Sequence, residues 1–330
     1  RLLLVTLSMS ILIIVWYITC VPWQSTGLYA LIHDPLNLRY AREKSLKLIN
    51  NPALKYAFSW YINTFAPLII SLSVLKTIYA RSIVKKVKWI LLIIVVSIFE
   101  MIQGSRTVFV LPIVVIIITY FIHANRICFS KIIFLCSLII LIPGIITMLR
   151  EIGNLEIQRL GSYIWRGGLW RIFGTPIYVG MLYGRYVEDY GYAGITAIRP
   201  LAFLVGRSYY PLAHIIGATY IAPYSETILA NANFVFYYYA AVGILYIPFL
   251  LLLLLGLDFL ILNVANIRKS TFVLLLPTLL LKASFAVQGL PTTTFLTGGY
   301  FWLLILPWLA GVKPHQCYEN SLIGVKERKA

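Results

Sequence analysis

The sequence predicts an all-α protein, a polytopic bundle of transmembrane helices with one large loop outside the membrane. Sixty per cent of the 330 residues are hydrophobic, only 12% are charged, and the mean hydropathy is +0.86. A soluble core does not need this much apolar surface. About eight runs approach the roughly 20 apolar residues that a helix needs to cross the bilayer core, where backbone polar groups must be bonded within the helix.

Each expected span is an apolar run that ends where polar or charged residues gather. In chain order they are Leu2–Pro22, Ala57–Tyr79, Trp89–Met101, Thr107–His123, Ile132–Met148, Phe234–Leu262, Thr271–Gln288 and Tyr300–Val312. The first run begins directly after Arg1, so we expect further helices upstream in the full protein. The expected domains are residues 1–149 with five helices and an outer connection at 23–53, a loop at 150–231, three helices within 232–312, and a tail at 313–330.

Basic residues in the short connections orient the bundle, because cytoplasmic loops carry an excess of lysine and arginine. The connection around Lys85 and Lys86 is the strongest anchor. Placing it in the cytoplasm puts the connections around Arg126 and Arg268, and the basic tail, on the same side. The long loop then lies outside, where its length of about 80 residues exempts it from the charge rule.

The connection at residues 23–50 would also lie outside, although it carries Arg39, Arg42, Lys44 and Lys47. Two interpretations are open. Either the number of spans differs by one, or outward-facing basic residues cooperate with the large loop on one anionic ligand.

The loop from Arg150 to Asn231 carries seven arginines and no lysine, against five acidic residues. Arginine grips phosphate and carboxylate oxygens through two parallel hydrogen bonds, whereas lysine presents a point charge. The excess of arginine therefore predicts a phosphate-bearing ligand. Tryptophan and tyrosine, which favour the headgroup level, recur along the loop and predict short interfacial or re-entrant helices.

Several chemistries are excluded by inspection. The chain has no GxxxxGK[ST], GxGxxG, HExxH, CxxC or GxSxG motif and no Asp-x-Asp pair. The net charge of +17 gathers at the ends of apolar segments, which indicates membrane orientation rather than nucleic-acid binding. The four scattered cysteines predict neither disulfides nor a metal cluster. We therefore expect no metal and no cofactor.

Three stretches resemble the bacterial O-antigen and oligosaccharide repeat-unit polymerases of the Wzy type. They are Gln103-Gly-Ser-Arg-Thr opening a helix, Arg171-Ile-Phe-Gly-Thr-Pro176 followed by Tyr183 to Gly194, and Ala230-Asn-Ala-Asn-Phe234 entering a helix. The resemblance runs from Leu38 to Pro248.

The resemblance implies a GT-C-like fold and a multi-pass protein of the bacterial inner membrane. It implies a metal-independent glycosyltransferase that moves a growing glycan from undecaprenyl diphosphate onto the non-reducing sugar of a new lipid-linked repeat unit. The reaction would take place at the periplasmic face. Its partners would be the lipid-linked oligosaccharide, membrane lipids and a chain-length regulator protein.

For such chemistry, cationic donors must stabilise the charge on the departing diphosphate, and a base must take the acceptor proton. We expect Arg166, Arg171 and Arg199 to bind the diphosphate, with Arg39, Arg42 and Arg106 as outer-face helpers. The candidate bases are Asp189, Glu188, Glu226 and His214. Asn231 and Asn233 would hydrogen-bond sugar hydroxyls or, equally, cap a helix.

Two other functions remain open. An O-antigen ligase of related architecture would use the same donor but join the glycan to a lipid core. A flippase or exporter of lipid-linked oligosaccharide would line a transport cavity with arginine, and would carry charge within its spans.

Overall fold

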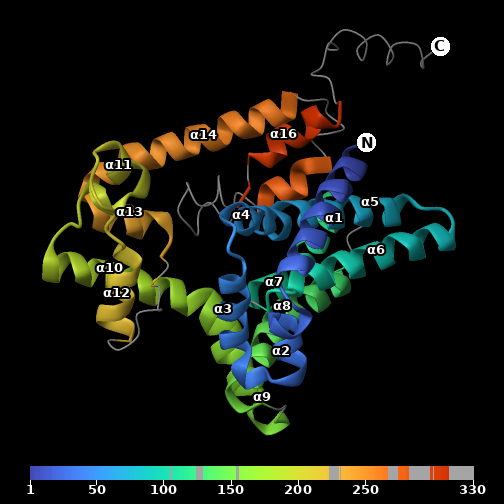
Figure 1. Cartoon of the computed structure of the whole chain (residues 1–330), viewed down its shortest axis with the longest axis horizontal. Coiled ribbons are helices and arrows are strands. Elements are labelled where there is room, and N and C mark those ends of the chain that lie inside the picture. The colour runs from blue at the N-terminus through green and yellow to red at the C-terminus, as the bar shows by residue number, and fades with distance from the viewer. Residues whose placement is uncertain are drawn as a thin grey trace.

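The computed structural model describes residues 1–104, 106–123, 129–153, 156–222, 230, 232–266, 274–281, 298–299 and 301–311 (Figure 1). All regular structure in these ranges is helical, as the sequence predicts. The chain opens with α1 (Leu2–Cys20), η1 (Trp23–Ser25), α2 (Gly27–His33), η2 (Pro35–Asn37), α3 (Leu38–Leu48), α4 (Pro52–Trp60), η3 (Tyr61–Phe65), α5 (Ala66–Tyr79), α6 (Ile83–Met101), α7 (Arg106–His123) and α8 (Phe129–Ile152). It continues with α9 (Ile157–Ile164), η4 (Trp165–Gly174), α10 (Thr175–Tyr190), η5 (Ile195–Ala197), α11 (Arg199–Leu204), α12 (Leu212–Ile216), η6 (Gly217–Ile221), α13 (Phe234–Val242), η7 (Gly243–Leu245), α14 (Tyr246–Asn266) and α16 (Trp302–Leu309).

Two helices in the described residues are long and apolar enough to cross a membrane, namely Leu2–Cys20 and Pro52–Tyr79. The number rises to four if each of two bent pairs of helices is one span. Helix α6, expected as a span, carries Lys85, Lys86 and Lys88 in its first turns and Glu100 near its end, more charged residues than either of the other two. The described part of the chain therefore has membrane-protein character, with fewer spans identified than the eight expected.

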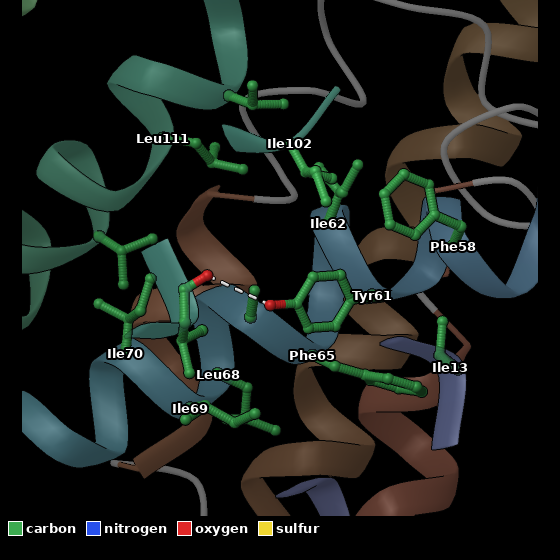
Figure 2. Packing of buried hydrophobic residues seen from close by; sticks show 14 of the residues in the cluster. Ile13, Phe58, Tyr61, Ile62, Phe65, Leu68, Ile69, Ile70, Ile102 and Leu111 are labelled. Atoms are coloured by element: carbon green, nitrogen blue, oxygen red, sulfur yellow. Dashed lines mark hydrogen bonds between the residues drawn. The ribbon is translucent and has the colours of Figure 1, made fainter. Parts of the chain in front are cut away.

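The first hydrophobic core surrounds the continuous helix α4–η3–α5 (Figure 2). The side chains of Tyr61, Phe65 and Leu68 are fully buried, and 83% of the most apolar window of this helix is buried. The Tyr61 hydroxyl donates to the carbonyl oxygen of Val96 on α6 at 3.2 Å, so the one polar atom of that side chain is satisfied. By contrast, only 28% of the window in α1 is buried, as expected of a helix with a lipid-facing side.

A second hydrophobic core lies within α10, α12 and α13, and it is rich in tyrosine. Tyr183 donates to the carbonyl of Ala230 at 2.7 Å, and Tyr237 donates to the carbonyl of Ala197 at 2.6 Å. Helix α13 thus packs with the large loop that precedes it. The sequence predicts one span over Phe234–Leu262. In the structure η7 at Gly243 separates α13 from α14, and a 70° bend follows between Phe234–Pro248 and Leu250–Gly256, so this segment counts as a span only if the bent pair is taken as one.

The first part of the large loop folds back along α8 as a helical hairpin, with an angle of 119° between Cys136–Ile152 and Ile157–Arg171. Glycines allow this close approach. A Cβ atom at Gly144 would lie 2.7 Å from the Ile164 Cα, and one at Gly168 would lie 2.6 Å from the Ile140 carbonyl oxygen. Close backbone contact through small residues is typical of helices that pack in membranes. The hairpin carries Arg166 and Arg171 back beside an apolar helix.

Candidate anion-binding site

The segment η4 contains two Trp-Arg pairs in the sequence Trp165-Arg-Gly-Gly-Leu-Trp-Arg171. Each tryptophan and each arginine recurs after five residues. In an α-helix, positions five apart point about 140° away from each other, because 3.6 residues complete one turn. An α-helical η4 would therefore direct the two arginines to different sides.

The segment η4 is instead a π-helix of 10 residues, and the backbone amide of Thr175 that follows it donates to the carbonyl oxygen of Trp170, five residues earlier. A π-helix is wound so that residues five apart lie next to each other, and such turns are frequent at functional sites. At about 4.4 residues per turn, a π-helix places positions five apart within about 50° of each other, against about 140° in an α-helix. Arg166 therefore shares a face with Arg171, and Trp165 shares one with Trp170.

These four side chains line an open pocket of about 560 Å³ together with Thr147 and Glu151 from the end of α8. That volume lies in the range of small-ligand sites, which is about 300–1,000 Å³. Two guanidinium groups against one carboxylate leave a net positive charge. The pocket can therefore accept an anion that presents several oxygens, and the exposed tryptophans provide flat apolar surfaces beside it.

The two arginines differ in their surroundings. The Arg166 guanidinium lies 3.8 Å from the Glu151 carboxylate and 5.9 Å from the Tyr163 ring, and both charged side chains are about half exposed or more. An exposed ion pair of this kind is worth only about 0–1 kcal/mol, so a phosphate could replace it. Arg171 is exposed and forms no ion pair within the described residues. Its guanidinium is therefore accessible to a ligand without displacing an acidic partner.

The structure does not bring Arg199 into this pocket. Its guanidinium lies 5.8 Å from the ring of Tyr209, in the region of the second core. Other loop arginines have acidic neighbours elsewhere: Arg159 lies 3.2 Å from Glu156, and Arg185 lies 3.7 Å from Asp189. The expected diphosphate-binding trio is thus reduced to the pair Arg166 and Arg171.

The candidate bases in the described residues also lie outside the pocket lining. Asp189 accepts a 2.5 Å hydrogen bond from the Tyr220 hydroxyl besides its contact with Arg185. Burial and this hydrogen bond raise the pKa of Tyr220 to about 12, so the phenol stays protonated and remains the donor. Glu188 and His214 are exposed, on α10 and α12. Glu226 lies outside the described residues.

The outer connection packs against the end of α8, where the hairpin begins. A Cβ atom at Gly153, just beyond α8, would lie 3.3 Å from the Leu36 side chain on η2. Arg42 is exposed on α3, although partial desolvation lowers the pKa of its guanidinium. Arg106 begins α7 and Arg39 lies on α3, but the side chains of both lie outside the described part.

The resemblance stretch around Gln103 has a structural role at this contact. Gly104 has φ +69°, and a Cβ atom there would lie 2.8 Å from the Gly27 Cα at the start of α2. The backbone amide of Leu28 donates to the carbonyl of Ile102 at 3.1 Å. Glycine at both positions lets the α6–α7 turn touch the outer connection directly.

The two asparagines also differ. The side chain of Asn233 accepts a 3.1 Å hydrogen bond from the backbone amide of Phe236, which makes it the N-cap of α13. Of its two expected roles, the structure therefore supplies the cap. Asn231 lies outside the described residues.

Sequence reasoning missed Thr147, Glu151, Trp165 and Trp170 as pocket residues. The sequence does not indicate Glu151, because its pairing with η4 depends on the hairpin. The five-residue repeat of Trp-Arg was the available signal, but it matches neither the 3.6-residue period of an α-helix nor the alternation of a strand. A π-helix, unlike these two structures, places residues at that spacing on one face.

The described fold and pocket define an all-helical protein of membrane type with an arginine- and tryptophan-lined pocket beside an apolar helical hairpin. Comparison with protein-family models, with curated proteins and with solved structures finds no match to this chain.

Proposed function

We propose that the protein is a membrane glycosyltransferase that takes its glycan from a polyprenyl diphosphate, and that it acts as an O-antigen polymerase at the periplasmic face of the inner membrane. The observation that carries the proposal is the pocket in which Arg166 and Arg171 point to one side of η4. Two guanidinium groups with a surplus of positive charge suit a diphosphate, which carries several anionic oxygens.

The place of the pocket suits a lipid-linked ligand. Segment η4 lies along α8, and Thr147 and Glu151 from the last turns of that apolar helix line the pocket. Trp165 and Trp170 are about half exposed beside the arginines, and tryptophan favours the level of lipid headgroups. A diphosphate whose polyprenyl tail stays in the bilayer would present its charge at that depth.

The chemistry needs few groups. The acceptor hydroxyl oxygen attacks the anomeric carbon, the bond from that carbon to the diphosphate oxygen breaks, and the electron pair leaves with the diphosphate. Arg166 and Arg171 stabilise the charge that collects on the departing oxygen, which is the role that preorganised cationic donors play. Glu151 takes the hydroxyl proton, because it is the carboxylate that lines the pocket.

The test compares two arginines of the same hairpin in a deletion strain that expresses each variant. Arg171→Ala is expected to abolish the ladder of repeat units on the surface glycan. Arg159→Ala is the matched control, since Arg159 pairs with Glu156 and lies outside the pocket. A full ladder from Arg171→Ala, at normal membrane abundance of the protein, would contradict the proposal.

The deletion itself separates the polymerase from its alternatives. Loss of a polymerase leaves the lipid core capped with one repeat unit, whereas loss of a ligase leaves bare core. Loss of an exporter leaves lipid-linked repeat units on the cytoplasmic side. Either of the last two phenotypes would reject the polymerase assignment.

A further inference from the structure

A second pocket lies in the outer connection, between α2, η2 and α3. Its volume is about 500 Å³. The lining residues are Gln24, Ser25, Tyr29, Ala30, Asp34, Asn37, Tyr40, Ala41 and Lys44. In the sequence this connection is distinguished by its basic charge. The pocket itself has a different chemical character.

The shape of the pocket follows from a short turn between two helices. Thr26 caps α2 by accepting a 3.2 Å hydrogen bond from the backbone amide of Tyr29, and η2 reverses the chain into α3. Tyr40 and Ala41 then lie on the same side of α3 as Lys44, because positions four and three residues apart fall near one face of a helix. The small side chains of Ala30 and Ala41 leave space between the helices.

The charges of this pocket do not select an anion. Lys44 is its basic lining residue and Asp34 is its acidic one, so the pair cancels. A single carboxylate also supplies too few oxygen ligands for a divalent cation. The pocket therefore suits a neutral polar ligand.

The lining groups match the polar hydroxyl groups and the apolar C–H faces of a sugar. Asp34 accepts a 2.8 Å hydrogen bond from the Asn37 side-chain amide through one oxygen, and its other oxygen accepts none from the described residues. That oxygen and the carboxamide of Gln24 are available to hydroxyl groups. Two tyrosines offer flat apolar faces for C–H groups: Tyr29, whose ring centroid lies 4.3 Å from that of His33 with the planes tilted by 33°, and the exposed Tyr40.

The pocket also adjoins the anion-binding site. The η2 turn forms its rim through Asn37, and its neighbour Leu36 touches the chain at Gly153, directly after α8. Glu151, two residues before that contact, lines the pocket of Arg166 and Arg171. Figure 1 shows α2, α3 and α9 gathered at the same end of the molecule.

We propose that the pocket between α2 and α3 is a saccharide-binding site, with Asp34 and Tyr40 as its principal contacts. Its assignment as the site of the acceptor sugar rests on the proposed glycosyltransferase function, whereas saccharide binding by the pocket can be measured without that function. The two pockets then divide the substrates, with the diphosphate held by η4 and the uncharged sugar held by the outer connection.

The test uses the full chain in lipid nanodiscs and two separate probes. One is the repeat-unit oligosaccharide released by mild acid from the host's own lipid-linked precursor, and the other is inorganic pyrophosphate. Tyr40→Ala and Asp34→Ala are expected to weaken oligosaccharide binding about tenfold or more and to leave pyrophosphate binding unchanged. Arg171→Ala is expected to do the reverse.

Tyr79→Ala is the matched control, because Tyr79 is 66% exposed, Tyr40 is 67% exposed, and Tyr79 does not line the pocket. Tyr40 is so exposed that its removal does not endanger folding. Unchanged oligosaccharide affinity in both Tyr40→Ala and Asp34→Ala, or no binding by the wild type, would overturn the saccharide site. Unchanged pyrophosphate affinity in Arg171→Ala would instead overturn the donor site, and thus the proposed function, while the saccharide result stands.

Discussion

Exchanging two adjacent residues tests whether the π-helical winding of η4 creates the anion site. The double variant Trp170→Arg, Arg171→Trp keeps the composition of the segment but moves the second arginine from five to four residues after Arg166. In an α-helix, positions four apart share a face, so the exchange would improve the pairing of the arginines. In the observed π-helix each residue turns by about 80°, so the exchange moves the second guanidinium by that angle around η4, away from the position in which it lines the pocket.

The expected size of the effect follows from the exposure of the site. A hydrogen bond to a charged group contributes about 1.5–3 kcal/mol, and the lower end applies here because the arginines lie in an open pocket. Loss of one guanidinium should therefore weaken pyrophosphate binding roughly tenfold. In the reaction the same loss should cost about 3–4 kcal/mol, or about a hundredfold or more in rate, because charge develops on the leaving oxygen.

The assay is calorimetric titration of the chain in nanodiscs with pyrophosphate, beside the single variant Arg171→Gln. The exchanged variant should bind as weakly as Arg171→Gln. Wild-type affinity in the exchanged variant would refute the reasoning, because an arginine four residues after Arg166 would then serve equally well. Circular dichroism and melting curves would show that both variants keep their helices.

Three further changes test the surroundings of the site. Gly168→Val should push η4 away from α8, destabilise the protein by about 1–3 kcal/mol and lower its melting temperature. The control Gly161→Ala, with open space around its Cβ position, should be neutral or slightly stabilising. Tyr183→Phe should cost about 1–3 kcal/mol, because a buried backbone carbonyl loses its 2.7 Å hydrogen bond, and the exposed Tyr178→Phe should not change the denaturation midpoint. Glu151→Gln should slow chain elongation about 10²-fold or more but leave pyrophosphate affinity equal or higher, since a negative charge is removed beside Arg166; an undiminished rate of elongation would count against Glu151 as the base.

The candidate site was only partly predictable. The arginine excess led to Arg166 and Arg171, since a count of charges does not depend on how the chain folds. The bases were not predictable in this way. Asp189 is bound by Tyr220 from 31 residues away, whereas Glu151 reaches the arginines because the chain reverses after α8. Both contacts depend on packing between segments that are separated in the chain.

The sequence by itself determined that the chain is helical and of membrane type, because apolar content and run length act locally and need no tertiary contacts. Only the tertiary structure decided that the large loop divides, with η4 packed along α8 and α10 packed in a separate tyrosine-rich core. Only it revealed the π-helical turn that gives the five-residue Trp-Arg repeat one face. Side chains that contact each other in the structure can be far apart in the sequence, or at a spacing that does not fit the α-helical period. Their contact then depends on close packing between segments, which local sequence does not specify.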